Sequence, residues 1–373
     1  MMDPLALAQS LIRCPSVTPA DAGAQSVVAD ALERLGFTVT RLRFGNIENL
    51  FARIGTTAPH FCFAGHTDVV PAGATTAWRG DPFAADVRDG ILYGRGACDM
   101  KGAIAAFVAA LSQHLESRTP QGSISMLITG DEEGIATDGT VRVLPWMQEN
   151  GHIPDFCVVG EPTCPVQLGD MVKIGRRGSI NATITLDGTQ GHVAYPHRTD
   201  NPIHRLVRAL NALTDAPIDA GSEFFQPSTL QVTSIDVGNT VTNLVPASAR
   251  AMLNIRFNER HSGASLAAWL RAVVAQYADN FEIVEQISGE SFLTQPGPMV
   301  DKLVEAITRE SGVTPKLDTG GGTSDARFIA RYCPVAEFGL VGATMHQVDE
   351  CVPVEELHTL TRIYRALIAT MVP

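Results

Sequence analysis

The sequence lacks the cysteine pattern of a disulfide-bonded protein or of a thiolate metal site. Its seven cysteines are scattered, odd in number, and never spaced as a CxxC pair. This pattern argues against a disulfide framework and against zinc held by thiolates. Free thiols are typical of a reducing compartment, so we expect a cytoplasmic protein.

Long apolar runs and an excess of basic residues are also missing. No stretch approaches the roughly 20 apolar residues of a membrane span. The start, Met1-Met2-Asp3-Pro4, has no basic segment in front of an apolar core. The formal net charge of -12 disfavours nucleic acids and anionic membranes as partners. We therefore expect no membrane partner and no nucleic-acid partner.

Internal repeats and low-complexity segments are absent, and the composition is that of a folded protein. Hydrophobic residues make up 45% of the chain, charged residues 18%, and there are 33 glycines. These values are typical of a loop-rich α/β enzyme. At 373 residues the chain exceeds what one hydrophobic core usually supports, so we expect two domains.

Strands and helices alternate in the first half of the chain. Apolar runs at 60–64, 123–129 and 156–159 read as buried strands, and helical patterns at 103–116 and 139–149 lie between them. Alternation of this kind predicts a mainly parallel sheet covered by helices, with a functional site at the carboxyl ends of the strands.

After residue 178 the pattern changes to half-solvated strands with period two. The order is strand 181–186, helix 202–213, strands 229–236 and 248–257, helix 264–277 and strand 281–284. This β-α-β-β-α-β order is similar to a ferredoxin-like α+β layer. We therefore predict an α/β catalytic domain from 1–178 and 292–373, with 179–291 as an inserted lid and dimerisation domain.

Histidine and carboxylate side chains recur where the predicted strands end, and in one turn near the C-terminus. They are His66, Asp68, Asp99, Glu132, Glu133, Glu161 and His346. Nitrogen and oxygen ligands suit Zn²⁺, with Co²⁺ or Mn²⁺ as substitutes. Asp68 can orient His66, and only one of the adjacent Glu132 and Glu133 need bind metal, which leaves two histidines and three carboxylates as ligands. These are too many for one tetrahedral ion, but they match two ions if one carboxylate bridges. The sequence therefore predicts a two-metal hydrolase site.

The adjacent carboxylates Glu132 and Glu133 fit two different tasks. Neighbouring side chains diverge in an extended segment, so one can bind metal while the other faces the water that the metal activates. The second would act as general base and pass the proton to the leaving amine.

Each motif alone has a simpler explanation. His66 and Asp68 could make an ordinary hydrogen bond at a strand end, and Glu132-Glu133 could be a solvated acidic turn. Asp99 could be a helix N-cap, because it stands just before the helix at 103–116. His192 alone reads as a surface loop histidine. The recurrence of such residues at several strand ends is what favours a metal site.

Four motifs taken together resemble one family. GHTDVVP (65–71), GRGACDMKG (94–102), DEEG (131–134) and GEPT (160–163) resemble the di-zinc amidohydrolases of the M20 metallopeptidase family. The match runs in order across the chain and implies a zinc-aminopeptidase-like catalytic domain. The resemblance implies that His66 and Glu161 bind one zinc, that Glu133 and His346 bind the other, and that Asp99 bridges them.

The same resemblance implies further roles. Glu132 would be the general base and Asp68 the partner that orients His66. His192 would come from the partner subunit of a homodimer and stabilise the developing oxyanion. Two Zn²⁺ per subunit are expected as cofactors, with Co²⁺ as a substitute.

Three stretches point to one branch of the family. DEEGIATDGT (131–140), GDMVKIGRRGS (169–179) and GGGTSDARFI (320–329) are similar to members that hydrolyse an N-succinylated diamino-diacid in lysine and diaminopimelate biosynthesis. Such a substrate carries several carboxylates, which Arg side chains and backbone N–H groups bind. The resemblance places these groups at Arg176, Asn243, Arg256, Gly322 and Thr323.

Two alternatives stay open from the sequence. One is the same chemistry on another acyl amino acid, such as N-acetylornithine, or on a peptide. The other is a non-catalytic relative that only binds ligands or dimerises. One departure from the family pattern is Cys98, directly before Asp99, where a small hydroxyl or apolar residue is expected; a thiolate ligand there would change the site.

Overall fold

The computed structural model describes all 373 residues and divides them into two compact units. The first unit comprises Met1–Ile174, Thr294–Asp318 and Ser324–Pro373, and the inserted unit comprises Gly175–Leu293 and Thr319–Thr323. The sequence assigned the Gly-rich loop at 319–323 to the outer segments of the chain. It packs with the inserted unit instead, because Thr319 Oγ1 donates a hydrogen bond to the Phe224 carbonyl (2.5 Å).

An eight-stranded mixed sheet forms the centre of the first unit. Its order is β1 (Thr38–Phe44), β2 (Ile47–Ile54), β6 (Ser123–Thr129), β3 (His60–His66), β7 (Phe156–Val159), β18 (Val335–Glu337), β8 (Met171–Lys173) and β17 (Lys316–Asp318). The central strands β6, β3, β7 and β18 are parallel, whereas β1 and β2 run antiparallel at one edge and β8 is antiparallel to β18. The predicted α/β class is confirmed, with a parallel centre and antiparallel additions at its edges.

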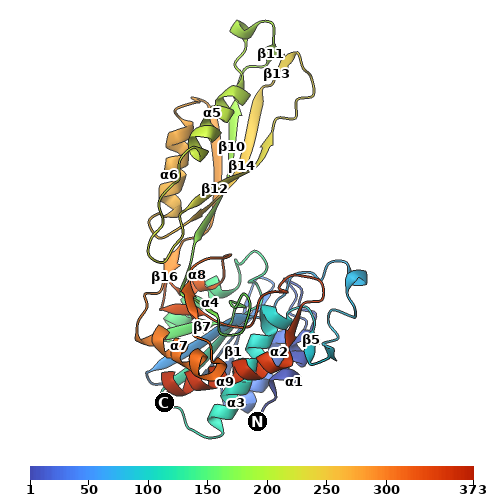
Figure 1. Ribbon diagram of the computed structural model, residues 1–373, viewed down its shortest axis with the longest axis vertical. Helices are drawn as coiled ribbons and strands as arrows, with labels where there is room; N and C mark the ends of the chain where they lie inside the picture. Colours follow the sequence, from blue (N-terminus) through green and yellow to red (C-terminus); the bar gives the residue numbers. More distant parts are fainter. The chain divides into compact units, whose positions relative to one another are not determined.

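Helices cover this sheet. They are α1 (Pro4–Ile12), α2 (Ala24–Arg34), α3 (Gly102–Leu115), α4 (Thr140–Glu149), α7 (Pro298–Ser311), α8 (Ala326–Ile329) and α9 (Val354–Met371). Helix α3 is apolar on all sides and is buried between α1, α9 and the sheet (Figure 1). Phe107 of α3 stacks on Phe63 of β3 at 4.3 Å, and Tyr364 of α9 meets both rings edge-on. This contact fixes α3 over the strand that ends at His66.

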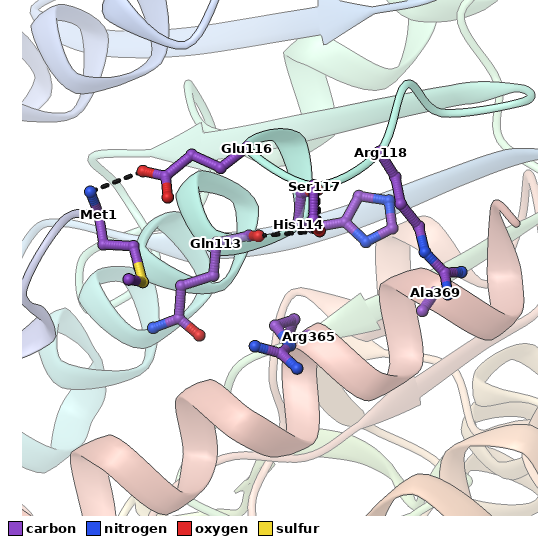
Figure 2. A pocket seen from close by; sticks show the side chains of 8 residues that line it. All are labelled: Met1, Gln113, His114, Glu116, Ser117, Arg118, Arg365 and Ala369. Carbon is purple, nitrogen blue, oxygen red and sulfur yellow. Dashed lines mark hydrogen bonds and ion pairs between the residues drawn. The ribbon is translucent and has the colours of Figure 1, made fainter.

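A hollow of about 540 Å³ lies at the C-terminal end of α3. Arg365 reaches it from α9 and Arg118 from the turn after α3, with the buried His114 ring between them (Figure 2). Because α3 has 14 residues, this end is about 20 Å from the helix N-terminus. The hollow is therefore separate from the cluster of predicted metal ligands, which lies at the other end of the helix.

The inserted unit has the predicted β-α-β-β-α-β order. It consists of β10 (Gly178–Asp187), α5 (Pro202–Thr214), β12 (Thr229–Asp236), β14 (Ser248–Phe257), α6 (Gly263–Val274) and β15 (Phe281–Gly289). The four strands form an antiparallel sheet in the order β12-β14-β10-β15, which is the ferredoxin-like arrangement. Helices α5 and α6 cover one face of this sheet (Figure 1). Alternate residues of β10 and β14 are buried on that face.

A small ribbon completes the inserted unit, formed by β11 (Gly191–His192) and β13 (Leu244–Val245). The short strands β9 (Gly175–Arg176) and β16 (Phe292–Leu293) pair where the chain enters and leaves this unit. In the first unit, β4 (Val87–Arg88), β5 (Ile91–Tyr93) and β19 (Cys351–Pro353) form a separate three-stranded sheet. None of the helices combines the length and the apolar character needed to cross a membrane.

Candidate metal centre

Three parallel strands end at one edge of the sheet, and each supplies side chains to the site. Strand β3 ends at His66, β6 at Thr129 just before Glu132 and Glu133, and β7 at Val159 just before Glu161. Because these strands are neighbours, their carboxyl ends meet. Asp99 enters from a short turn at Ala97–Lys101 that leads into α3, and His346 from a loop after β18.

The Asp99 carboxylate lies between the two histidines. Its Oδ1 is 3.2 Å from His66 Nε2, and its Oδ2 is 3.2 Å from His346 Nε2. Glu133 Oε1 lies 2.9 Å from His346 Nε2, and Glu161 Oε1 lies 3.8 Å from His66 Nε2. The two oxygens of one carboxylate thus belong to two groups of ligand atoms, as a bridging carboxylate requires.

The donor set fits divalent cations. His66, Asp99 and Glu133 offer atoms within 4.8 Å of one another, and so do His66, Glu132 and Glu161. A tetrahedral ion with bonds of about 2.0–2.1 Å separates its ligand atoms by roughly 3.3 Å, close to the contacts seen around Asp99. Imidazole and carboxylate donors without thiolate suit Zn²⁺ and similar ions.

Electrostatics show how strongly this cluster attracts positive charge. Hydrogen bonds with Asp99 and Glu133 raise the pKa of His346 to about 10. Burial alone would lower the pKa of His66, but the bond to Asp99 and the charges of Glu161 and Glu132 raise it well above its usual range. Burial would raise the pKa of Asp99, but both imidazoles outweigh it and lower that pKa. Protons on the imidazoles supply such charge, and divalent cations supply it where they displace those protons.

The loop after β3 holds His66 and the acidic turn together. His66 Nδ1 contacts the main-chain carbonyl of Asp68 at 2.9 Å, whereas the Asp68 carboxylate is 3.7 Å away. That carboxylate accepts hydrogen bonds from the backbone N–H groups of Glu132 (3.2 Å) and Glu133 (3.0 Å). Burial raises the pKa of Asp68 to about 6, against the effect of His66 and these N–H groups. The Asp68 carbonyl is thus the nearer partner of His66 Nδ1, and the Asp68 carboxylate is hydrogen-bonded to the acidic turn.

Glu132 faces a different set of neighbours from Glu133. Burial, followed by the charge of Glu161, raises the pKa of Glu132 well above its usual range. The buried carboxyl of Asp325 adds to this shift. Asp325 stands in the GGGTSDARFI stretch, but no local pattern places it beside Glu132, because that proximity arises only when α8 packs against α4.

Two expectations about the Asp99 turn are settled by its contacts. Asp99 does not cap α3, since the residue at the N-cap position is Lys101 and no side chain caps that end. The Asp99–Met100 peptide bond is cis.

Cys98 Sγ lies 3.3 Å from Glu350 Oε1, and burial together with Glu350 raises its thiol pKa well above the usual range. Cys98 is therefore hydrogen-bonded to Glu350 and belongs to neither group of candidate ligands.

Glu350 was not identified from the sequence, although it is fully buried beside the Asp99 turn. It stands four residues after His346 in a polar stretch, His346-Gln347-Val348-Asp349-Glu350, where Asp349 and Glu350 are indistinguishable by sequence. Only the structure shows which of the two is inside.

The remaining predicted residues belong to the inserted unit. His192 is exposed on β11 and opposite Leu244 of β13, and the Asn243 carbonyl accepts the N–H of the next residue, Val193 (3.1 Å). The ribbon therefore brings His192 and Asn243 together. The N–H of Ala194 donates to His192 Nδ1 at 3.1 Å, which leaves Nε2 as the outward nitrogen.

Arginines and the Gly-rich loop form a second group in the inserted unit. Arg176 is buried, and its Nη1 donates to the Gly322 carbonyl (3.2 Å) next to Thr323. Gly321 has φ +100°, a backbone conformation that favours glycine, and a Cβ there would lie 2.9 Å from Arg176 Nη1. Arg256 is half-buried, and its Nε donates to Asn254 Oδ1 (3.1 Å).

Comparison with known proteins gives consistent matches along the whole chain. The peptidase family M20/M25/M40 matches residues 62–370. The chain is 61% identical over 369 residues to the succinyl-diaminopimelate desuccinylase of Gluconacetobacter diazotrophicus, covering 98% of this chain and 96% of that protein. It is 58% identical over 371 residues to the protein of the same name from Caulobacter vibrioides strain NA1000, covering 98% and 95%.

Solved structures show the same fold at much lower identity. An M20 family metallo-carboxypeptidase from Sulfolobus solfataricus aligns with a TM-score of 0.78 at 17% identity, covering 99% of both chains. The YXEP protein of Bacillus subtilis, described as a dinuclear metal binding peptidase, aligns with a TM-score of 0.73 at 15% identity, covering 99% of this chain and 97% of that one. At these identities the likeness establishes the fold.

Proposed function

The chain belongs to the peptidase family M20/M25/M40, and on this premise we propose that it is a metal-dependent amidohydrolase of lysine and diaminopimelate biosynthesis. It cleaves the amide bond of N-succinyl-LL-2,6-diaminoheptanedioate, giving succinate and LL-2,6-diaminoheptanedioate, and it acts in the cytoplasm. Near-full-length identity to relatives named for this activity supports the substrate. The observation that carries the chemistry is the Asp99 carboxylate, whose two oxygens face two different imidazoles.

The site would hold two Zn²⁺ ions, with Co²⁺ as a substitute. His66 and Glu161 would hold one ion, Glu133 and His346 the other, and Asp99 would bridge them. The contacts within each of these groups, from 2.9 Å to 3.8 Å, support this division. Bound ions of this kind polarise a scissile carbonyl and lower the pKa of a water molecule.

The chain's own residues then move the proton. Glu132 takes a proton from the attacking water and gives it to the nitrogen of the leaving amine. Its raised pKa favours proton uptake, and the bonds from the Glu132 and Glu133 N–H groups to Asp68 hold the acidic turn against the end of β3.

His192 and a second subunit complete this proposal. His192, supplied by the partner of a homodimer, donates a hydrogen bond from its outward Nε2 to the oxyanion that develops on the carbonyl. Exposed apolar side chains on both edge strands of the inserted sheet, Ile235 of β12 and Val284 of β15, support association through this unit.

The substrate's carboxylates bind to Arg176, Asn243, Arg256 and the loop containing Gly322 and Thr323. Guanidinium forks and a Gly-rich backbone supply the charge-assisted donors that such groups need in a protein of net charge -12. The contact between Arg176 and Gly322 supports a shared role for the arginine and the loop.

A direct assay tests the substrate. We expect kcat/KM for N-succinyl-LL-2,6-diaminoheptanedioate to exceed that for N-acetylornithine by at least about 100-fold. The reason is that an acetyl group lacks the free carboxylate at the end of a succinyl group, which the proposed arginines and Gly-rich loop would bind. Release of free amine from each substrate by the zinc-loaded protein is the measurement. Cleavage of N-acetylornithine alone would identify a different deacylase of the family.

Mixing two inactive variants tests the partner's contribution. His192→Ala and Glu132→Gln chains, each nearly inactive alone, should regain activity when mixed and allowed to exchange subunits. In an equal mixture, half of the dimers contain one chain of each variant. Each such dimer has one intact site out of two, formed by Glu132 of one chain and His192 of the other. About a quarter of wild-type kcat is therefore expected. The control is the same mixture kept without exchange. If exchange is demonstrated by mass and activity stays absent, His192 does not come from the partner.

A further inference from the structure

We propose that Glu350, paired with Arg95, is the positioning residue that fixes the Asp99 carboxylate between its two imidazoles and joins it to the loop that carries His346. This inference rests on the proposed function, because it concerns the same two-metal site. It assigns a task to a buried ion pair that contacts none of the proposed ligand atoms.

The carboxylate of Glu350 binds the backbone of the Asp99 turn. Its Oε1 accepts the N–H groups of Cys98 (3.0 Å) and Asp99 (3.2 Å), and its Oε2 accepts the N–H of Gly96 (3.0 Å). Glu350 has no exposed surface, so these bonds are made away from water. Bonds from N–H groups to a buried carboxylate are among the stronger hydrogen bonds of proteins.

The turn depends on this external acceptor because of its shape. Asp99 has φ -121° and ψ 92°, which interrupts helical hydrogen bonding between the turn and α3. Gly96 has φ +86°, and a Cβ there would lie 2.8 Å from Val69 Cγ1. The chain is therefore bent tightly at Gly96, and the N–H groups of Cys98 and Asp99 meet the Glu350 side chain instead of helical carbonyls.

Arg95 extends the contact to the other ligand-bearing loops. Its Nη1 lies 2.6 Å from Glu350 Oε2 and also donates to the Gln347 carbonyl (3.2 Å). Its Nη2 donates to the carbonyls of His346 and Pro71, both at 3.4 Å. Pro71 follows the His66-Asp68 loop, so one buried guanidinium connects the loops that carry His66, Asp99 and His346.

Glu350→Gln is the test, because it keeps the size of the side chain but removes its charge. Both oxygens of Glu350 accept hydrogen bonds, but a glutamine has one oxygen and one NH₂ group. That NH₂ group would face the backbone N–H groups or Arg95, which are also donors, and this should displace the Asp99 turn. We expect zinc affinity, measured by competition with a chelator, to fall by about 10–100-fold for both ions, as for other groups that orient ligands. The visible absorption spectrum of the cobalt-loaded protein should change at equal metal occupancy and equal folded fraction.

Asp349→Asn is the matched control, since it makes the same chemical change one residue earlier. Asp349 pairs with the exposed Arg79 side chain, and the backbone N–H of Arg79 donates to Asp349 Oδ1 (2.9 Å). The Asp349 φ of +58° suits asparagine. Its metal affinity and cobalt spectrum should match those of the wild type. Equal metal affinity and an identical cobalt spectrum for Glu350→Gln and wild type would overturn the inference.

A second variant covers the case in which Glu350→Gln fails to fold. Arg95→Lys keeps one positive charge beside Glu350 but cannot reach the carbonyls of both Gln347 and His346. It should weaken metal binding by several-fold and change the cobalt spectrum; unchanged values would overturn the inference. Failure of the wild type itself to bind two ions would instead contradict the proposed function.

Discussion

Glu132→Gln is expected to retain both metal ions and to lower kcat by a factor of about 10²–10⁴ or more. The variant keeps the volume of the side chain and removes its ability to take a proton. Glu133 contacts His346, and Asp99 contacts both imidazoles, without involving the Glu132 carboxylate. The ligand geometry should therefore survive, and only the proton transfer should be lost.

The adjacent residue provides the matched control for this prediction. Glu133→Gln makes the same chemical change one position later, but it removes a charge 2.9 Å from His346 Nε2. It should lose the ion on the His346 side, which metal analysis after dialysis would show. Turnover and metal content must be measured on the same preparations. If Glu132→Gln retained substantial turnover, or if both variants lost metal equally, the division between base and ligand would be wrong.

Asp99→Asn is expected to weaken both ions and to abolish turnover at ordinary zinc concentrations. One of the two oxygens becomes an NH₂ group, and the bridging charge is lost, although the size of the side chain is unchanged. The loss should exceed the 10–100-fold typical of groups that only orient ligands, because Asp99 contacts both histidines directly.

His66→Ala should behave differently from Asp99→Asn. It removes a ligand from one group and leaves the 2.9 Å contact between His346 and Glu133 intact. We expect one ion to be retained and the other lost, as measured by calorimetric zinc titration of the ion-free proteins. If Asp99→Asn bound one ion as tightly as the wild type and weakened only the other, Asp99 would not bridge the two ions.

Much of the site could be predicted because it follows the strands. His66, Glu132, Glu133 and Glu161 stand directly after apolar runs, and parallel neighbours bring such positions together without knowledge of any contact. The inserted unit was predictable for a similar reason, since the alternation in β10, β12 and β14 matches the observed strands closely.

Other features depend on packing between distant segments. Strands β8 and β17 have three residues each, too few to establish a period. Glu350 and Asp325 are ordinary acidic residues until the fold buries one beside Arg95 and the other near Glu132. The loop at 319–323 belongs to the inserted unit through contacts with Phe224 and Arg176, which no local pattern encodes.

The position of β18 in the sheet has a consequence for synthesis of the chain. Strand β7 has no exposed residue and pairs with β18 along one side, yet 175 residues separate Val159 from Val335. At roughly 5–20 residues per second, ribosomes need on the order of 10–35 s to make that stretch. During this time the nascent chain carries an apolar strand with an open hydrogen-bonding edge beside a metal site in which His346 is the one proposed ligand still missing. His346, Glu350 and α9 follow β18, so the edge is closed and the site is completed only after β18 and the segments behind it are made.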